Sequence, residues 1–295
     1  MNQRTHQHGG TNSPLQLAVF GDPISHSRSP WIHQAFAAQR SRQDPNFALD
    51  HRAIRCNLDQ LPNALTTFRD QGGHGLNVTL PLKQAVVAHC VSLSETAHAS
   101  AAMNTLVWRE AEQGWHGDNT DGPGLLNDLQ RLSVPLRGKR ILMIGAGGAA
   151  AGVLPSLLSA QPAALSIANR SLERAQALCA QHAASQVTLR AMPLDEDPGG
   201  RAFDVVIQAT SAGHSQASVP LSPAWLAEQS VVYDLNYGAA HQPIAQWCQQ
   251  RGCAVHDGLG MLVEQAALSF ALWTGWRPDT QPVLTALRQQ LNSPA

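Results

Sequence analysis

The segment "KRILMIGAGGAAAG", residues 139–152, constrains the fold more than any other part of the chain. It begins with an apolar run, continues through a cluster of glycines, and ends in small residues. A short apolar run bounded by glycine predicts a strand buried on both faces, as in a parallel sheet. A strand, a tight glycine turn and a helix in succession indicate an α/β fold.

The glycine cluster fits the pattern G-x-G-x-x-A, with Gly145, Gly147 and Ala150 at the fixed positions. The first glycine allows the tight turn, the second lets the backbone approach a pyrophosphate, and the small third residue lets helix and strand pack closely. The helix N-terminus adds free amides and a positive dipole end. Tight turns also use glycine for purely structural reasons. The strand-turn-helix context nevertheless favours a dinucleotide site.

The end of the next predicted strand carries Asn169, Arg170 and Ser171, and Arg174 follows in the first turn of a helix. An NAD site usually has Asp or Glu here, because a carboxylate binds the ribose 2′-hydroxyl. Guanidinium groups instead match phosphate with paired donors. Exposed helix starts often carry arginine without a ligand, but two arginines in place of the acid favour NADP over NAD.

Composition excludes several classes of protein. The chain has 295 residues, more than one hydrophobic core usually supports, which predicts two domains. Its 20 Lys and Arg nearly balance its 21 Asp and Glu, so no basic excess indicates a nucleic acid or an anionic membrane as partner. No apolar run approaches the roughly 18 to 20 residues of a membrane span.

Cysteine and histidine usage argues against a metal site. The five cysteines form no CxxC pair, and the 13 histidines show no HExxH pattern. The first 14 residues are polar and lack the apolar region of a secretory signal, so we interpret residues 1–14 as a disordered extension. An odd number of cysteines without such a signal predicts reduced thiols in a cytoplasmic protein.

Strands and helices alternate along the chain, which predicts two α/β units, each with a mostly parallel sheet. In the first unit we expect strands at residues 15–21, 49–55 and 75–80 and a hairpin at 102–109 and 114–119. Its expected helices begin at Pro30 with Ser29 as N-cap, near residue 58 and near Pro81. In the second unit we expect a helix at 172–183 and strands at 139–144, 164–168, 187–190, 203–208 and 231–235. Pro155 lies inside the helix expected after the glycine turn and can kink it.

Two more helices, predicted at about 261–273 and 282–291, look too long to be appendages of the second unit. We place them on the first unit, which makes it discontinuous. The expected domains are residues 15–121 together with 258–295 for substrate binding and catalysis, and residues 122–257 for a Rossmann-type nucleotide-binding domain.

Four polar clusters interrupt the first unit: "SHSRSP", "NVTLPLK", "MNT" and "GDNTDG". Each has a bland explanation by itself, since Ser27 and Ser29 suit a turn and a helix cap, Asp121 suits an N-cap and Lys83 suits an exposed surface. Three of the clusters nevertheless follow predicted strands, and the fourth opens a helix. Ligands of open α/β sheets bind at such strand ends.

These segments, in their order, are similar to the shikimate dehydrogenase family. The resemblance rests on "AVFGDPISHSRSPWIHQAF", "GLNVTLPLK", "AMNTL", "GDNTDGPGLL", "IGAGGAAAGVL", "NRSLERA", "ATSAG" and "DGLGMLVEQAALSF". It implies two α/β domains with a cleft between them and the NADPH-dependent reduction of 3-dehydroshikimate to shikimate, in the route to aromatic amino acids. It covers the chain from Ala18 to the C-terminal helix.

The resemblance also implies roles for individual residues. The catalytic pair would be Lys83 and Asp121, and Ser27 and Ser29 would bind the substrate carboxylate. The remaining substrate contacts would be Asn77, Thr79, Asn104, Tyr237 and Gln265. The cofactor contacts would be Gly145, Ala146, Gly147, Gly148, Ala149, Asn169, Arg170, Arg174, Thr210, Leu235 and Gly258. Leu235 stands where many members of the family have Met, from which we expect a slight change in cofactor packing.

Two alternatives remain at the sequence level. One is a relative that acts on quinate, a class that includes forms using NAD. The other is a regulator that binds NADP without catalysis, since a fold alone does not prove an activity. The intact Lys83 and Asp121 argue against the regulator, and Arg170 and Arg174 argue against NAD. We expect a small-molecule substrate and no nucleic acid or membrane partner, in a monomer or a homodimer.

Overall fold

The computed structural model describes residues 13–196, 198, 202–210 and 221–292 of the chain. Residues 1–12 of the predicted N-terminal extension, and Ser211, Ala212 and Gly213 of the "ATSAG" segment, lie outside the described residues.

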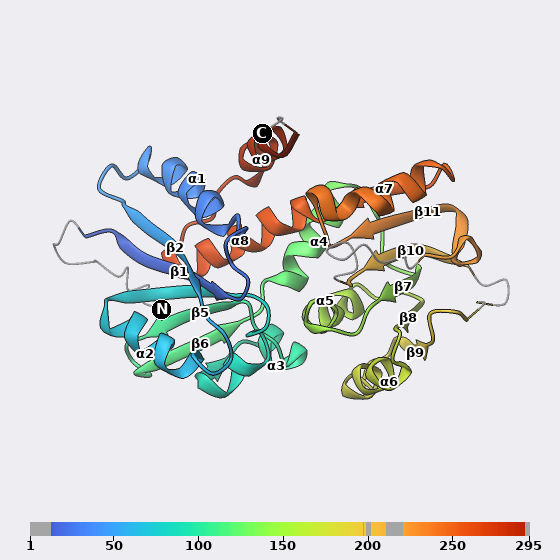
Figure 1. The fold of residues 1–295 in the computed structure, drawn as a ribbon, viewed down its shortest axis with the longest axis horizontal. Coiled ribbons are helices and arrows are strands. Elements are labelled where there is room, and N and C mark those ends of the chain that lie inside the picture. Colours follow the sequence, from blue (N-terminus) through green and yellow to red (C-terminus); the bar gives the residue numbers. More distant parts are fainter. Residues whose placement is uncertain (1–12, 197, 199–201, 211–220, 293–295) are drawn as a thin grey trace, which may run out of the picture.

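Two six-stranded sheets lie side by side, each with its own helices (Figure 1). The first sheet has the order β2-β1-β3-β5-β6-β4, and it is mixed because β5 runs antiparallel to both β3 and β6. Its strands are β1 (Leu15–Gly21), β2 (Leu49–Arg55), β3 (Gly73–Val78), β4 (Cys90–Leu93), β5 (Thr105–Arg109) and β6 (Gly114–Asp118). The helices of this part of the chain are α1 (Ser29–Ser41), α2 (Leu61–Asp70), the 3-10 helix η1 (Ala85–His89) and α3 (Glu95–Ser100).

The second sheet is parallel throughout, with the order β12-β11-β10-β7-β8-β9. Its strands are β7 (Arg140–Ile144), β8 (Ala164–Ala168), β9 (Thr188–Met192), β10 (Phe203–Gln208), β11 (Leu226–Asp234) and β12 (Ala254–Asp257). Its helices are α5 (Gly148–Ser159), α6 (Leu172–Gln181), the 3-10 helices η3 (Pro223–Trp225) and η4 (Gly238–His241), and α7 (Gln242–Gln249). The strand order reverses between β7 and β10, which is the usual position of a dinucleotide in a Rossmann-type sheet.

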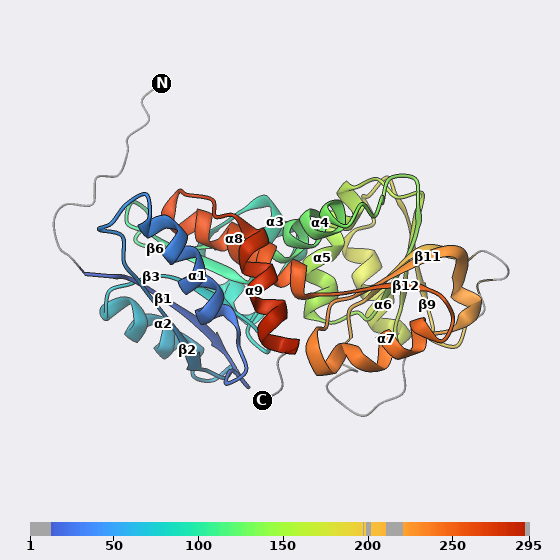
Figure 2. The ribbon, with the colours of Figure 1, turned by 90° about the horizontal axis from the view of Figure 1, so that it is seen from above.

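Each sheet is covered on both faces, which explains why its central strands are almost wholly apolar. On the first sheet, one core is formed with α2 and η1, and the other with α1, α8 (Leu259–Thr274) and α9 (Thr280–Asn292). On the second sheet, one core is formed with α4 (Asp121–Arg131), α5 and α6, and the other with α7. Figure 2 shows these layers from above.

The chain crosses between the two sheets along α4 and α8, which pack against each other (Figure 1). Helix α8 is buried on most of its sides because it contacts α1 and α9 as well as α4. Where α4, α8 and β11 meet, the Tyr233 hydroxyl donates to Asp128 Oδ2 at 2.7 Å. Asp128 also accepts from Arg131 Nε at 2.8 Å, so this buried carboxylate is fully paired.

Several predicted elements are confirmed. β1, β2, β8 and β10 have the predicted bounds, the hairpin pairs antiparallel, and the helix expected after the glycine turn is α5, which contains Pro155. The α/β fold class is confirmed as well. The α3, β4, α7 and β12 elements were not predicted from the sequence.

Three local predictions were wrong. No α-helix begins at Pro81, because the Lys83 carbonyl accepts from Met103 N at 2.8 Å and is not free for a helical bond, so the chain forms only η1. The N-cap of α1 is Arg28, with Ser29 already inside the helix. Asp121 is not a cap of α4: Thr120 holds that position, and the Asp121 carboxylate points to other side chains.

Candidate active site

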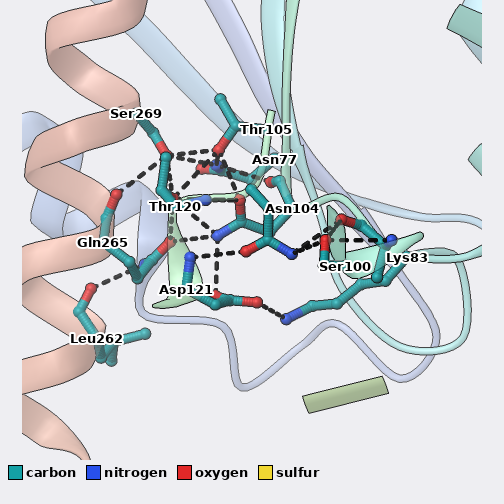
Figure 3. A network of polar contacts seen from close by, with 12 residues as sticks. Asn77, Lys83, Ser100, Asn104, Thr105, Thr120, Asp121, Leu262, Gln265 and Ser269 are labelled. Carbon is teal, nitrogen blue, oxygen red and sulfur yellow. Dashed lines mark hydrogen bonds and ion pairs between the residues drawn. The ribbon is translucent and has the colours of Figure 1, made fainter. Parts of the chain in front are cut away.

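Lys83 and Asp121 form an ion pair at the centre of the site (Figure 3). Lys83 follows β3, Asp121 is the first residue of α4, and Lys83 Nζ donates to Asp121 Oδ2 at 2.5 Å. The side chains are 16% and 8% exposed. A charge pair so shielded from water interacts more strongly than one on the surface, and each charge depends on the other for compensation.

Asn104 connects this pair to helix α8. Its Nδ2 donates to Asp121 Oδ1 at 2.9 Å, to Thr120 Oγ1 at 2.8 Å and to Gln265 Oε1 at 3.0 Å (Figure 3). Its Oδ1 accepts from the Thr120 amide at 2.9 Å. Both carboxylate oxygens of Asp121 therefore have a donor, and the side chain is held in one orientation.

Asn77, at the end of β3, continues the network away from the ion pair. Its Nδ2 donates to the Asn104 carbonyl at 3.1 Å, to Thr105 Oγ1 at 3.3 Å and to Ser269 Oγ at 3.2 Å. Ser269 lies one turn beyond Gln265 on the same face of α8. The structure thus brings together four of the predicted residues, Asn77, Asn104, Asp121 and Gln265, with Lys83.

Three hydroxyl residues of this network were missed from the sequence: Thr105, Thr120 and Ser269. Thr105 Oγ1 and Ser269 Oγ are 2.6 Å apart, and Thr120 Oγ1 lies 3.2 Å from Ser269 Oγ. A signal for each was available. Thr105 and Thr120 lie inside the "MNT" and "GDNTDG" clusters, and Ser269 follows Gln265 at helical spacing.

Ser27 lies on the loop that leads into α1, and Ser29 is the first residue of that helix. Ser27 Oγ accepts from the Ser29 amide at 3.3 Å, and Ser29 is buried. Tyr237 comes from the loop after β11, and its ring packs on the core that contains α1 and α8. Burial raises the pKa of the Tyr237 hydroxyl, and the positive charge of Arg28 opposes that rise. The second unit therefore contributes a phenol close to Arg28, the residue between the two serines.

Thr79 directly follows β3 and is half-buried. Its amide donates to the Phe20 carbonyl at 2.9 Å, which ties it to the end of β1. Among the described residues, no hydrogen bond joins the Thr79 side chain to the other predicted site residues, so Thr79 is not part of the network.

The glycine turn lies between β7 and α5. Gly145 has φ +111°, and a Cβ there would lie 3.0 Å from Thr210 Cγ2 and 3.1 Å from Ala209. Only glycine suits that backbone. Within the described part of the chain, a Cβ on Gly147 or Gly148 would have no neighbour within 4 Å, so the backbone here is open. Together with Ala146 and Ala149, this turn forms the N-terminus of α5, where the free amides of a helix suit an anion.

The ion pair and the glycine turn are joined by α5. Gly152 lies one helical turn after Gly148, and a Cβ on Gly152 would lie 3.4 Å from Asp121 Oδ2. The same Cβ would lie 3.2 Å from Asn119 Nδ2. The helix that begins at the glycine turn therefore packs directly on the Asp121 carboxylate.

Arg170 and Arg174 lie at the carboxyl end of β8, and both are exposed. Neither guanidinium has a hydrogen-bond or ion-pair partner among the described residues. Asn169 Nδ2 donates to the Ser171 carbonyl at 2.8 Å, which shapes the turn that carries Arg170. Two unpaired guanidiniums at this strand end are available to an anionic ligand.

The loop after β11 carries Leu235 and Tyr237 and is held by buried Asp234. Asp234 accepts from the Asn236 amide at 3.0 Å and contacts His241 Nδ1 at 3.0 Å. Gly258 lies against this loop, and a Cβ there would collide with the Leu235 carbonyl oxygen. Asn236 Nδ2 donates to the Thr210 carbonyl at 3.0 Å, which joins the loop to the end of β10.

The described residues contain no group of three or more His, Cys, Asp or Glu side chains placed to hold a metal ion. No helix among them is both long enough and apolar enough to cross a membrane.

A Rossmann-type sheet beside a second α/β unit with a buried Lys–Asp pair is the arrangement expected of a nicotinamide-nucleotide-dependent oxidoreductase, and the curated relatives below belong to that class. Three family models match the chain. They are the shikimate dehydrogenase substrate binding domain at residues 19–106, shikimate / quinate 5-dehydrogenase at 128–219, and the shikimate 5'-dehydrogenase C-terminal domain at 258–288. The chain belongs to the shikimate dehydrogenase family.

Curated relatives and solved structures agree with this assignment. The chain is 47% identical to the shikimate dehydrogenase (NADP(+)) of Xanthomonas euvesicatoria, over 92% of this chain and 95% of that protein. It is 45% identical to the corresponding protein of Alcanivorax borkumensis, with the same coverage of both chains. Among solved structures, it is similar to shikimate 5-dehydrogenase of Thermus thermophilus in complex with NADP(H) and shikimate, with a TM-score of 0.78 and 33% identity over 93% of this chain and 99% of that one.

Proposed function

We propose that this chain catalyses the reversible NADPH-dependent reduction of 3-dehydroshikimate to shikimate, in the route to aromatic amino acids. The observation that carries the proposal is the contact between α5 and Asp121. The helix that opens at the glycine turn packs on the carboxylate that is paired with Lys83. A cofactor bound at that turn is thereby placed on the same side of the molecule as the ion pair.

The residues at the glycine turn fit a dinucleotide phosphate. A Cβ on Gly147 or Gly148 would meet no described atom within 4 Å, and no described side chain caps the start of α5, whose free amides suit phosphate. Arg170 and Arg174 supply charge for a 2′-phosphate, which supports NADP over NAD. Thr210 lies against Gly145 of this turn, and Asn236 joins Thr210 to the loop that carries Leu235, against which Gly258 packs. When bound, NADPH supplies the hydride that reduces the ketone carbon.

Lys83 and Asp121 act on the oxygen of that ketone. As the carbonyl π bond breaks, negative charge grows on the oxygen, and a pre-positioned ammonium stabilises it better than water does. The oxygen takes up one proton, and the product is the alcohol. Lys83 either donates that proton as general acid or polarises the carbonyl while another donor supplies it. Asp121 keeps Lys83 in place, and Asn104 and Asn119 fix Asp121.

The other predicted contacts bind the rest of the substrate. The Ser27 and Ser29 hydroxyls donate to the carboxylate, which needs no arginine there. Asn77, Thr79, Asn104, Tyr237 and Gln265 are the proposed partners of the ring hydroxyls and of the ring itself. Hydrogen bonds among the buried members hold their side chains in place, and such preorganisation lowers the entropy cost of binding.

The limits of the two domains are proposed on the same grounds. We assign residues 15–121 with 258–295 to substrate binding and catalysis, and residues 122–257 to the nucleotide-binding domain. The assignment of the C-terminal segment is supported by α8 and α9, whose apolar side chains share one core with β1 and α1. A cytoplasmic location is supported by the five cysteines, all of which are free. A monomer and a homodimer are both compatible with these features.

The experiment is a nicotinamide absorbance assay with purified protein, 3-dehydroshikimate and NADPH. NADH runs in parallel, and shikimate and quinate are compared in the reverse direction. Turnover with NADPH and 3-dehydroshikimate, and with shikimate rather than quinate, is the expected result. Protein that binds NADPH but turns over none of these pairs would contradict the proposal and favour a non-catalytic regulator.

A further inference from the structure

His33 is a fully buried histidine for which the proposed reaction has no role. It lies on α1 with aromatic side chains around it, and its ring stacks on His51 at a centroid distance of 4.5 Å. The rings of Trp273, Phe36 and Phe270 lie at 5.0, 6.1 and 6.2 Å. In this apolar surrounding, one polar contact stands out: His33 Nε2 lies 3.1 Å from Asn77 Oδ1.

The direction of this hydrogen bond follows from the other contacts of Asn77. Asn77 Nδ2 faces three acceptors, the Asn104 carbonyl, Thr105 Oγ1 and Ser269 Oγ (Figure 3). The remaining amide atom, Oδ1, can only accept, so His33 Nε2 carries a hydrogen and donates. His33 Nδ1 has no partner among the described residues and bears the lone pair of a neutral ring. Burial lowers the pKa of His33 to about 4, which agrees with a neutral ring at physiological pH.

Contacts at its two ends leave the Asn77 amide one favourable orientation. If the amide rotated by half a turn, its oxygen would face the Asn104 carbonyl, a repulsive contact that water could not relieve in a buried site. In the observed orientation, Oδ1 faces His33, and the Nε2–H of that ring donates to it. His33 therefore holds the oxygen end of the Asn77 amide, while the NH₂ end faces the substrate network.

We propose that His33 is a positioning residue: by donating to Oδ1 it holds the Asn77 amide in place, with the NH₂ group on the side from which it donates to a ring hydroxyl of the substrate. The proposal rests on the proposed function, because it specifies how that substrate is recognised. His33 also follows Ser29 by one turn of α1, so a single helix positions both the carboxylate contact and, through Asn77, a hydroxyl contact.

The test compares three single variants. His33→Phe keeps a ring but removes the donor, and we expect KM for shikimate to rise about ten-fold, with KM for NADP unchanged. His33→Gln places an amide N–H near the position of Nε2 and should restore most of the affinity. Phe36→Leu is the control: it is equally buried on α1 beside His33, so it should lower the melting temperature and leave KM for shikimate unchanged.

A double-mutant cycle distinguishes positioning from a general packing effect. If His33 acts through Asn77, then His33→Phe should add nothing to the KM of Asn77→Ala. If the wild type is active, additive effects or an unchanged KM in His33→Phe would overturn the positioning role of His33 but not the proposed function. An inactive wild type would overturn the proposed function instead. In that case the side-chain amide signals of Asn77 in a ¹⁵N spectrum still decide, since its pair of NH₂ signals should be sharp and exchange slowly with water in the wild type and should be broadened and exchange faster in His33→Phe. Unaltered signals would refute the role.

Discussion

Lys83 Nζ lies 2.5 Å from Asp121 Oδ2, although the two residues are 38 positions apart and belong to different elements. Lys83 is carried by the segment after β3 and Asp121 by the start of α4. Asn104 Nδ2 donates to the other carboxylate oxygen of Asp121, and Asn119 Oδ1 accepts from the Asp121 backbone amide. The pair is thus built from strand ends and one helix start, which is where an open α/β sheet places its ligands.

Removal of the Lys83 ammonium should lower kcat. We expect Lys83→Ala to reduce kcat by about 100- to 10,000-fold with little change in KM, because the cation acts on charge that develops only in the transition state. Lys83→Arg separates two roles, since arginine keeps the charge but does not release a proton. Steady-state kinetics with shikimate and NADP is the measurement. A kcat near that of the wild type in Lys83→Ala would show that the ammonium group is not needed for catalysis.

Substitution of the two serines should affect KM. We expect Ser27→Ala and Ser29→Ala each to raise KM for shikimate by about ten-fold, because each removes one hydrogen bond to a carboxylate. NADP binding should be unaffected. Ser25→Ala is the matched control, since Ser25 is exposed on the same loop. The same KM in all three variants would show that the loop does not bind the carboxylate.

Loss of the two arginines should change the choice of cofactor. We expect Arg170→Ala and Arg174→Ala each to raise KM for NADPH by about ten-fold while leaving KM for NADH almost constant, because only NADPH carries the 2′-phosphate. Arg251→Ala removes an exposed arginine elsewhere in the second unit and controls for net charge. Equal effects on NADPH and NADH would speak against a phosphate contact.

Acid should destabilise the protein through His33 and His51. Burial lowers the pKa of His33 from 6.5 to about 4 and the pKa of His51 well below its usual value. Below pH 6.5 these histidines are protonated in the unfolded chain but stay neutral in the folded chain. Their contribution to the free energy of unfolding is therefore fully present above that pH and is lost as the pH falls towards 4. His33 alone should account for roughly 2 kcal/mol between pH 7 and pH 5. Urea unfolding of the wild type and of His33→Phe at both pH values measures this pH-dependent loss of stability, and the part due to His33 should be absent from the variant.

The contact between Tyr233 and Asp128 should contribute to stability. We expect Tyr233→Phe to lower the free energy of unfolding by about 1 to 3 kcal/mol, because it removes a donor from a fully buried carboxylate. Arg131 remains as a partner of Asp128 and limits the loss. Tyr237→Phe is a suitable control for urea unfolding, since no described residue bonds to the Tyr237 hydroxyl. Equal stability of Tyr233→Phe and the wild type would mean that water replaces the lost donor.

Elements with a clear local pattern were predictable. The apolar run before Gly145 fixed β7, and the turn that follows it has the positive φ that only glycine adopts easily. β4 and α3 were missed because they are short, with four and six residues, and carry little periodic signal. The helix expected at Pro81 does not form because the backbone amide of Met103, from another segment, donates to the Lys83 carbonyl.

By itself, the sequence determined the two α/β units, the glycine turn and, through the motifs, the residues that bear the chemistry. Only the tertiary structure decided which partner each buried polar atom has. Ser269 meets Thr105 across 164 positions, and His33 meets Asn77 across 44. Local pattern depends on neighbours within a few residues, whereas a buried donor must find an acceptor wherever the chain brings one, and that requirement is met only when the whole fold has formed.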